Sequence, residues 1–256
     1  MEQKGEWKTI NGAHVLIKDG QSVDEAFDKR GSSAKSGSIV VGKGESVDWN
    51  DKTTQENQTH RIFNNKLEVD EFFFYDDDKR GLLAKRNSLH GKWEKSLSPH
   101  QRYVINDYTA DGYSNINSYL RGYDNGNKYS VDYVKSHIKA LDGAIANYEI
   151  REPFITYRSI DSAAFVLYLN DFSRLEGTEY TDKAFMSTSP DLNSPALNKD
   201  VLMTIKVPKG KGIGAYINEY NGLGETEFLL ARDSKFKITK AYFDGRDYQI
   251  EMELIR

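Results

Sequence analysis

The chain has 256 residues, a formal net charge of −4, 38% apolar residues and 29% charged residues, which suits one ordinary domain with a real core. The acidic balance disfavours a nucleic-acid binder, and the complete lack of cysteine excludes a disulfide framework, cysteine-ligated zinc and a thiol nucleophile. No apolar run approaches the ~20 residues that a membrane helix requires, so we expect no membrane span.

The first 85 residues predict a partly irregular N-terminal extension. Residues 7–17 read as two short strands around an Asn11-Gly12 turn, a common signal for a tight hairpin. Residues 31–60 are rich in Gly, Ser, Lys, Asp, Asn and Gln, which predicts a linker or a mobile surface region. The apolar patch at residues 72–75 predicts a short buried strand.

Three helices are predicted between residues 98 and 145. Ser98 and Gln101 have capping-box spacing around a proline at the first helical position, so a first helix should run from 99 to about 109. A second, short helix should end at Arg121, with Gly122 as its C-terminal stop. A third helix, capped by Ser130, carries one apolar face formed by Val131, Val134, Ile138, Leu141 and Ile145.

From residue 154 onward the pattern favours strands. Residues 162–170 predict a further helix, but the other apolar runs are short and spaced like strands. Helices first and many strands afterwards indicate an α+β domain, which we place at residues 86–256. The predicted strands cover residues 154–158, 183–187, 201–207, 213–217, 226–230, 236–243 and 248–255.

Two glutamates form the clearest candidate for chemistry. Residues i and i+2 of a strand point to one face, so Glu225 and Glu227 should place two carboxylates side by side. Two carboxylates placed side by side repel each other, and this cost suggests that the pair acts on a cation or on a glycosidic bond. Cleavage of a ribose–nicotinamide bond develops oxocarbenium character that one carboxylate stabilises, while the other can orient a protonated guanidinium nucleophile.

Two further polar elements precede the glutamates, each at the end of a predicted strand. Arg158 carries a planar guanidinium, which suits the pyrophosphate of a dinucleotide because it can donate two parallel hydrogen bonds. The hydroxyls of Ser187, Thr188 and Ser189 can bond either the strand that bears the glutamates or a ribose hydroxyl. Each of these patterns alone usually marks a surface feature, so the functional interpretation rests on their order along the chain.

That order resembles the arginine–serine–glutamate signature of bacterial mono-ADP-ribosyltransferases, above all the clostridial Rho-modifying exoenzymes and the enzymatic components of binary actin toxins. Residues 107–121, which end in Asn117 and then Leu120-Arg121, are similar to an early helix segment of the family. Residues 203–217 are similar to the strand that leads into its catalytic loop. The resemblance covers roughly residues 90–256 and implies two packed, mainly antiparallel sheets flanked by N-terminal helices.

The resemblance also implies a role for individual residues. Glu227 would be the catalytic glutamate, Glu225 the member that favours an arginine acceptor, and Arg158 the contact to the phosphates of NAD, the co-substrate. Ser187, with Thr188, would hold the nicotinamide ribose. The remaining implied contacts are Arg121 to phosphate, Tyr113 and Asn117 near the adenosine, and Tyr220 in a recognition loop at 218–224.

The sequence departs from the family pattern in places. Ser159 follows the strand arginine where the family often has arginine or glycine. The segment from Pro190 to Asp200 lacks a clear aromatic-plus-arginine clamp over the nicotinamide. These departures put the nicotinamide contacts and the protein target in doubt, and not the reaction class.

Other activities are compatible with the same residues. An NAD glycohydrolase would use water as acceptor, and a toxin- or phage-associated binding module would keep the fold with an inactive site. A carbohydrate hydrolase is disfavoured, because two carboxylates on one strand cannot flank a sugar from opposite sides.

The expected partner is a protein that carries an acceptor arginine, such as actin or another host protein, and we expect no nucleic-acid partner. The scattered histidines show no metal-ligand spacing, so no metal is expected. We further expect a monomer that is secreted or injected and acts in the host cytosol, although residues 1–7 contain no apolar signal core.

Overall fold

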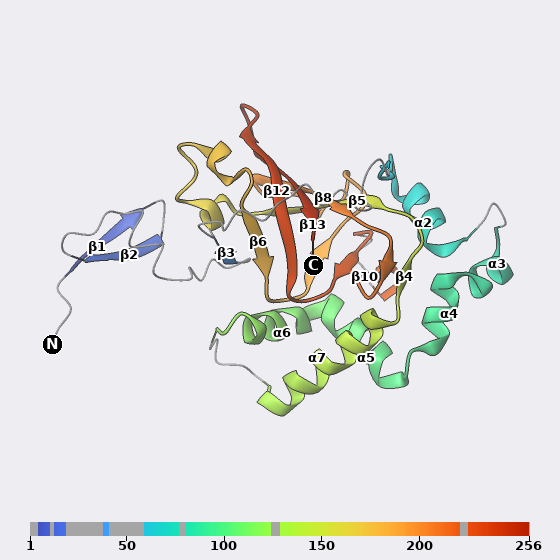
Figure 1. Ribbon diagram of the computed structural model, residues 1–256. Helices are drawn as coiled ribbons and strands as arrows, with labels where there is room; N and C mark the ends of the chain where they lie inside the picture. The colour runs from blue at the N-terminus through green and yellow to red at the C-terminus, as the bar shows by residue number, and fades with distance from the viewer. Residues whose placement is uncertain are drawn as a thin grey trace.

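The computed structural model describes residues 5–10, 13–18, 38–40, 59–76, 80–123, 129–220 and 225–255. Helices dominate its first half and strands its second half, as predicted for an α+β domain (Figure 1). Ahead of the helices, the predicted hairpin is present, with β1 (Gly5–Ile10) antiparallel to β2 (Ala13–Lys18). The helices are α2 (Lys66–Phe74), α3 (Leu82–Asn87), α4 (Leu89–Ser96), α5 (Pro99–Asp107), α6 (Tyr113–Leu120) and α7 (Val131–Ala146).

The predicted helix boundaries follow from local capping. The Ser98 hydroxyl accepts from the Gln101 amide, and the Gln101 side chain accepts from the Ser98 amide, so α5 begins with a complete capping box. Helix α6 ends before Gly122, whose φ of 77° suits glycine. Between α5 and α6 the chain does not break but continues through a π-helical turn (Tyr108–Gly112).

Helix α7 presents its predicted apolar face to the core. Ser130 caps it by accepting from the Tyr133 amide, and Val134, Ile138 and Leu141 are buried. Val131, which the periodicity assigned to the same face, is 50% exposed because it belongs to the first turn. Helices α5, α6 and α7 lie together along one side of the sheets (Figure 1).

The larger sheet has six strands in the order β3-β6-β12-β13-β8-β5. Its pairs are antiparallel except for β13 and β8, which run parallel. Strand β8 alternates buried and partly buried residues throughout, as expected for a strand with one face on the core. The strands are β3 (Ser38–Val40), β5 (Phe154–Ile160), β6 (Glu179–Asp182), β8 (Val201–Val207), β12 (Ser234–Phe243) and β13 (Tyr248–Leu254).

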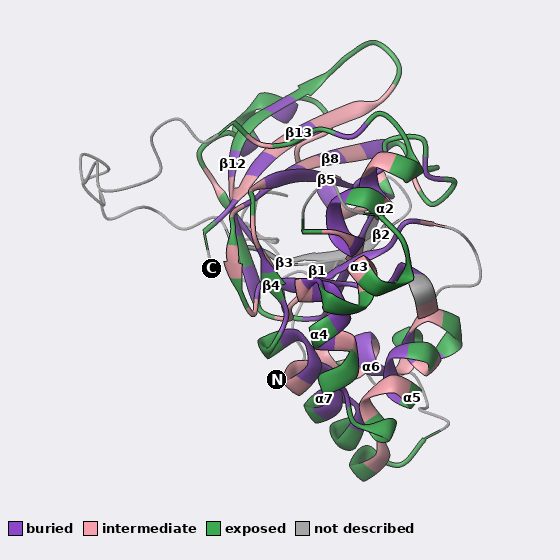
Figure 2. Ribbon diagram, turned by 90° about the vertical axis from the view of Figure 1, so that its right-hand side faces the viewer, coloured by how far each residue is buried: buried purple, intermediate pink, exposed green. Residues whose placement is uncertain are grey.

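A smaller sheet packs beside the larger one. Its order is β10 (Gly214–Tyr216), β11 (Phe228–Leu230) and β7 (Met186–Thr188), all antiparallel. An antiparallel bridge between Tyr157 and Ser189 joins β5 to the end of β7. A further short pair is formed by β4 (Glu149–Ile150) and β9 (Gly210–Lys211). Strands β5 and β8 are largely buried in Figure 2, and all three residues of β11 are buried.

Two local predictions were wrong. Residues 72–75 do not form a strand, because Asn65 caps a helix by accepting from the Glu68 amide and that helix runs to Phe74. Residues 162–170 contain a short 3-10 turn (Ser162–Phe165) in place of an α-helix, and a second turn follows (Phe172–Leu175). The predicted linker or mobile surface region at residues 31–60 lies mostly outside the described residues, and its described segment Ser38–Val40 pairs with β6 as strand β3.

Helix α2 packs into the same core as the strands that follow it by more than 80 residues in sequence. The Phe73 ring stacks on Tyr216 with centroids 4.4 Å apart and on Phe228 with centroids 5.5 Å apart. Phe63 bridges to Asp191 in a parallel pairing. Arg61 likewise bridges to Phe154 of β5. The predicted division between residues 85 and 86 stays a prediction, and this packing leads us to infer that the folding unit that contains the strands begins by residue 61.

That inference can be tested with two variants of one helix. Phe73→Ala should lower the free energy of unfolding by about 3–5 kcal/mol, because it empties a buried aromatic site between two sheets. Leu67→Ala, on the same helix but 74% exposed, should change it by less than about 0.5 kcal/mol. Urea denaturation followed by tryptophan fluorescence measures both, and equally small effects would show that α2 is an independent appendage.

Candidate functional site

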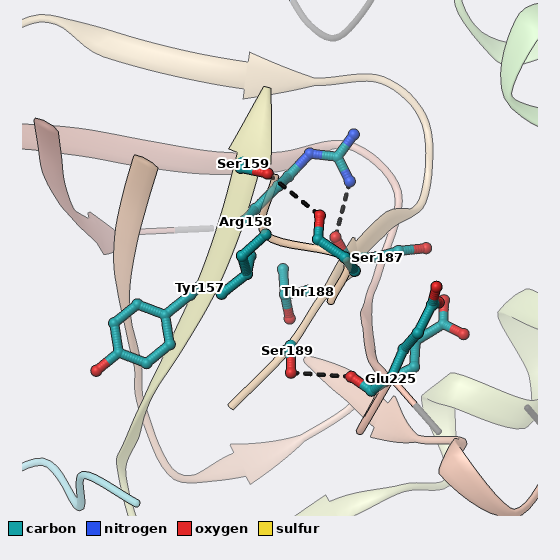
Figure 3. Close-up of a pocket in the computed structure, with 10 residues that line it drawn as sticks. Tyr157, Arg158, Ser159, Ser187, Thr188, Ser189 and Glu225 are labelled. Carbon is teal, nitrogen blue, oxygen red and sulfur yellow. Dashed lines mark hydrogen bonds between the residues drawn. The ribbon is translucent and has the colours of Figure 1, made fainter. Parts of the chain in front are cut away.

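An open cleft of about 140 Å³ lies where β5, β7 and the segment before β11 meet (Figure 3). It brings together the three elements singled out in the sequence: the strand arginine, the Ser-Thr-Ser run and the glutamate pair. The cleft is small against the ~300–1,000 Å³ of ordinary ligand pockets, so it suits one end of a dinucleotide. Its lining residues are Tyr157, Arg158, Ser159, Ser187, Thr188, Ser189, Ala196, Leu197, Glu225 and Glu227.

The two glutamates share this cleft, but strand geometry is not the reason. Strand β11 begins at Phe228, so Glu225 and Glu227 precede it. Thr226 between them has φ of 51°, a left-handed conformation that no regular strand contains. The prediction of one shared face was therefore based on the wrong local structure. A turn at Thr226 places both carboxylates, and Glu227 is only 6% exposed.

Side-chain hydroxyls hold the backbone of the glutamate segment. Thr188 donates to the carbonyl of Phe228 at 2.8 Å and accepts from Thr156 at 2.7 Å. The Ser189 hydroxyl lies 2.9 Å from the carbonyl of Glu225, to which Ser194 also donates at 3.0 Å. Of the two uses considered for these hydroxyls, Thr188 and Ser189 bond the backbone of the glutamate segment and of β11, and not a ribose.

Arg158 extends from β5 over the cleft toward Ser187 (Figure 3). Its Nη1 donates to the carbonyl of Ser187 at 2.7 Å, which fixes the guanidinium plane. The Arg158 Nε atom is buried and has no hydrogen-bond partner among the described residues. A buried donor without a partner is costly, so the site fits an anionic group such as a phosphate.

The guanidinium of Arg121 forms an ion pair with a carboxylate. Its Nε and Nη2 donate to the two oxygens of Asp182 at 3.1 and 2.8 Å, and Asp182 is fully buried. Arg121 does not line the cleft. The predicted phosphate contact of Arg121 stays a prediction, and its ion pair shows that Asp182 sets its position.

Tyr108, at the start of the π-helical turn, is a buried neighbour of the site that the sequence reasoning did not single out. Its hydroxyl accepts from Asn117 Nδ2 at 3.0 Å. Burial, and then the nearby Glu227 carboxylate, raise the pKa of Tyr108, so it stays protonated and can donate. The only signal in the sequence was that Tyr108 lies between Asp107 and Tyr113, in the segment similar to the family's early helix. Tyr113 is 49% exposed, with its ring centroid 6.3 Å from that of Tyr108.

Tyr220, predicted to contact the acceptor, is attached to helix α5 and the turn after it. Its hydroxyl accepts from Arg102 Nη1 at 3.4 Å, and its carbonyl accepts from Thr109 at 2.9 Å. The remainder of the predicted recognition loop, residues 221–224, lies outside the described residues. The acceptor role of Tyr220 stays a prediction.

Comparison with known proteins agrees with this geometry. A family model described as ADP-ribosyltransferase exoenzyme matches residues 86–253. An NAD(+)–arginine ADP-ribosyltransferase, EFV, from Enterococcus faecalis is 28% identical in an alignment of 243 residues that covers 84% of this chain and 49% of that protein. The mono(ADP-ribosyl)transferase SpvB of Salmonella typhimurium is 27% identical in an alignment of 188 residues that covers 64% of this chain and 31% of that protein. The chain thus spans half or less of the length of these curated relatives.

A solved structure shares the fold. The ADP-ribosylating toxin BECa of a C. perfringens binary enterotoxin, crystallised with NADH, superposes with a TM-score of 0.56 at 26% identity. The superposition covers 65% of this chain and 46% of that one. The α+β fold with two packed sheets and preceding helices is therefore confirmed.

The buried Arg121–Asp182 ion pair should contribute measurably to the free energy of unfolding. Asp182→Ala should lower the free energy of unfolding by about 3 kcal/mol, because it strands a largely buried guanidinium without its partner. Glu253→Ala breaks the half-exposed pair with Lys206 and should cost less than about 1 kcal/mol. Chemical denaturation measures both, and a cost for Asp182→Ala no greater than that for Glu253→Ala would contradict the buried pair.

Proposed function

Because the chain belongs to the ADP-ribosyltransferase exoenzyme family, we propose that it transfers the ADP-ribose of NAD to an arginine side chain of a protein. The bond between the ribose carbon and the nicotinamide nitrogen breaks, and its electron pair leaves with neutral nicotinamide. A guanidinium nitrogen then bonds the same carbon and gives up a proton. The observation that carries this proposal is the single cleft that holds Arg158, Glu225 and Glu227.

Arg158 and Ser187 are proposed to hold NAD. The Nε of Arg158, which has no hydrogen-bond partner among the described residues, can donate a charge-assisted hydrogen bond to a phosphate of NAD. The small cleft beside it suits the nicotinamide end of NAD. The Ser187 side chain lines that cleft, and Thr188 serves it indirectly through strand β11. The NADH-bound relative supports this choice of co-substrate.

The two glutamates divide the reaction between them. Glu227 is nearly buried, and a carboxylate in such a place stabilises the positive charge that develops on the ribose as nicotinamide leaves. Glu225 is less buried and precedes it, so we assign it to the incoming guanidinium. An arginine acceptor is supported by the activity named for the E. faecalis relative.

The partner would be a protein with an exposed arginine, on actin or another host protein, and the enzyme would act as a monomer after secretion or injection. No helix in the described ranges is both long and apolar enough to cross a bilayer. NAD glycohydrolysis, with water in place of the guanidinium, is the second candidate, because it needs Glu227 and Arg158 but not Glu225.

Nicotinamide release from NAD, with and without agmatine as an arginine analogue, separates these roles. Glu227→Gln should lower release by about 10²–10³-fold under both conditions, because the developing charge loses its carboxylate. Glu225→Gln should retain hydrolysis of NAD and lose the stimulation by agmatine.

The matched control is Glu149→Gln, which removes an exposed carboxylate on β4 and should behave as wild type. Full activity of Glu227→Gln would contradict the proposed transferase. Release that never responds to agmatine or to a protein acceptor would favour the glycohydrolase, and no release and no thermal stabilisation by NAD would favour an inactive module.

A further inference from the structure

Thr226, between the two glutamates, is held in a conformation that it would not adopt alone. It has a β-branched side chain, a φ of 51° and only 1% exposure. Such strain persists where surrounding contacts hold the residue in place. Its hydroxyl lies 2.8 Å from that of Ser189, and its amide donates to Asn218 Oδ1 at 3.0 Å.

The peptide group that joins Glu225 to Thr226 is fixed at both ends. Its carbonyl interacts with the hydroxyls of Ser189 and Ser194, and its N–H donates to Asn218. Because a peptide group is planar, contacts on opposite edges determine the orientation of the whole plane. That plane fixes the Cα–C bond of Glu225, and the Glu225 side chain leaves the backbone from this Cα.

Asn218 can serve this N–H only in one orientation. A side-chain amide has a donor end and an acceptor end, whereas an ionised carboxylate only accepts. Asp70 Oδ1 lies 3.4 Å from Asn218 Nδ2 and also accepts from the Tyr216 hydroxyl at 2.6 Å. The carboxylate therefore attracts the amino end of Asn218 and leaves the carbonyl end for Thr226.

Asp70 belongs to helix α2, outside the residues 86–253 that match the family model. The helix is held against the small sheet by the stacking of Phe73 on Tyr216. A residue of the N-terminal part thus lies two hydrogen bonds away from the peptide between the glutamates.

We propose that Asp70 is a positioning residue, which orients Asn218 and through it the Glu225–Thr226 peptide. Its catalytic consequence rests on the proposed function. Glu227 keeps a separate anchor, because its carbonyl accepts from the Ile217 amide at 3.0 Å directly before β11. Loss of Asp70 therefore moves Glu225 more than Glu227, and it impairs transfer to a guanidinium more than cleavage of NAD.

Hydrogen exchange tests the positioning without any reaction. Asp70→Ala should accelerate exchange of the Thr226 amide by about tenfold, while the amides of β11 keep their protection. Asn218→Ala removes the acceptor itself and should accelerate it at least as much, which provides a second measurement if Asp70→Ala folds poorly. Tyr216→Phe is the matched control, because it removes the other bond to the same carboxylate oxygen and leaves Asn218 in place.

Kinetics then tests the consequence. In Asp70→Ala, the ratio of agmatine modification to NAD hydrolysis should fall by about fivefold with an unchanged KM for NAD, whereas Tyr216→Phe should keep the wild-type ratio. Equal losses in Asp70→Ala and Tyr216→Phe would overturn the inference, since Asp70 would then only anchor helix α2. Unchanged Thr226 exchange in Asp70→Ala would overturn it as well. Faster exchange in a protein whose wild type releases no nicotinamide would support the positioning and refute the proposed function instead.

Discussion

The pairing of β7 with β11 is the contact on which the site depends. It brings a strand that ends in Ser187 and Thr188, with Ser189 directly after it, against the strand that follows the two glutamates. Thr188 reinforces that pairing with a bond to the Phe228 carbonyl, and Ser189 extends it to the carbonyl of Glu225. These side chains bond the backbone, whereas Ser187, Glu225 and Glu227 line the cleft.

Each charged side chain of this region has either an ion-pair partner or a role in the proposed reaction. Two carboxylates close together repel each other, and Arg158 is the cation that lines the cleft with them. Arg121, the second arginine of this region, is neutralised by the buried Asp182. Tyr108 stays protonated because burial and the Glu227 carboxylate both disfavour its anion, so it adds a hydrogen-bond donor without adding charge.

The N-terminal part contributes to this site as well as to the core. Helix α2 buries three successive phenylalanines, one of which stacks on Tyr216 and Phe228 of the small sheet, whose strand β11 directly follows the glutamates. The same helix places Asp70 beside Tyr216 and Asn218. Packing and hydrogen bonding thus couple a segment outside the matched family region to the residues on which the proposed chemistry depends.

The sequence by itself determined the elements whose signals are local. The capping box at Ser98 and the apolar periodicity of α7 fixed helix positions, and the ordered arginine, Ser-Thr-Ser and glutamate elements identified the cleft. Only the tertiary structure decided how the parts meet. Residues 72–74 are apolar enough for a strand or a helix, and the cap at Asn65 and the burial of the helix decide for the helix.

The shared direction of Glu225 and Glu227 likewise came from a left-handed Thr226, which contacts distant in sequence hold in place. Arg121 faces a carboxylate 61 residues away, and the Tyr108 hydroxyl donates to the carbonyl of Phe185, 77 residues away. Spacing along the chain reports which residues can share one helix face or strand face. It does not report which partners a buried side chain finds across the fold, because that depends on how separate elements pack in three dimensions.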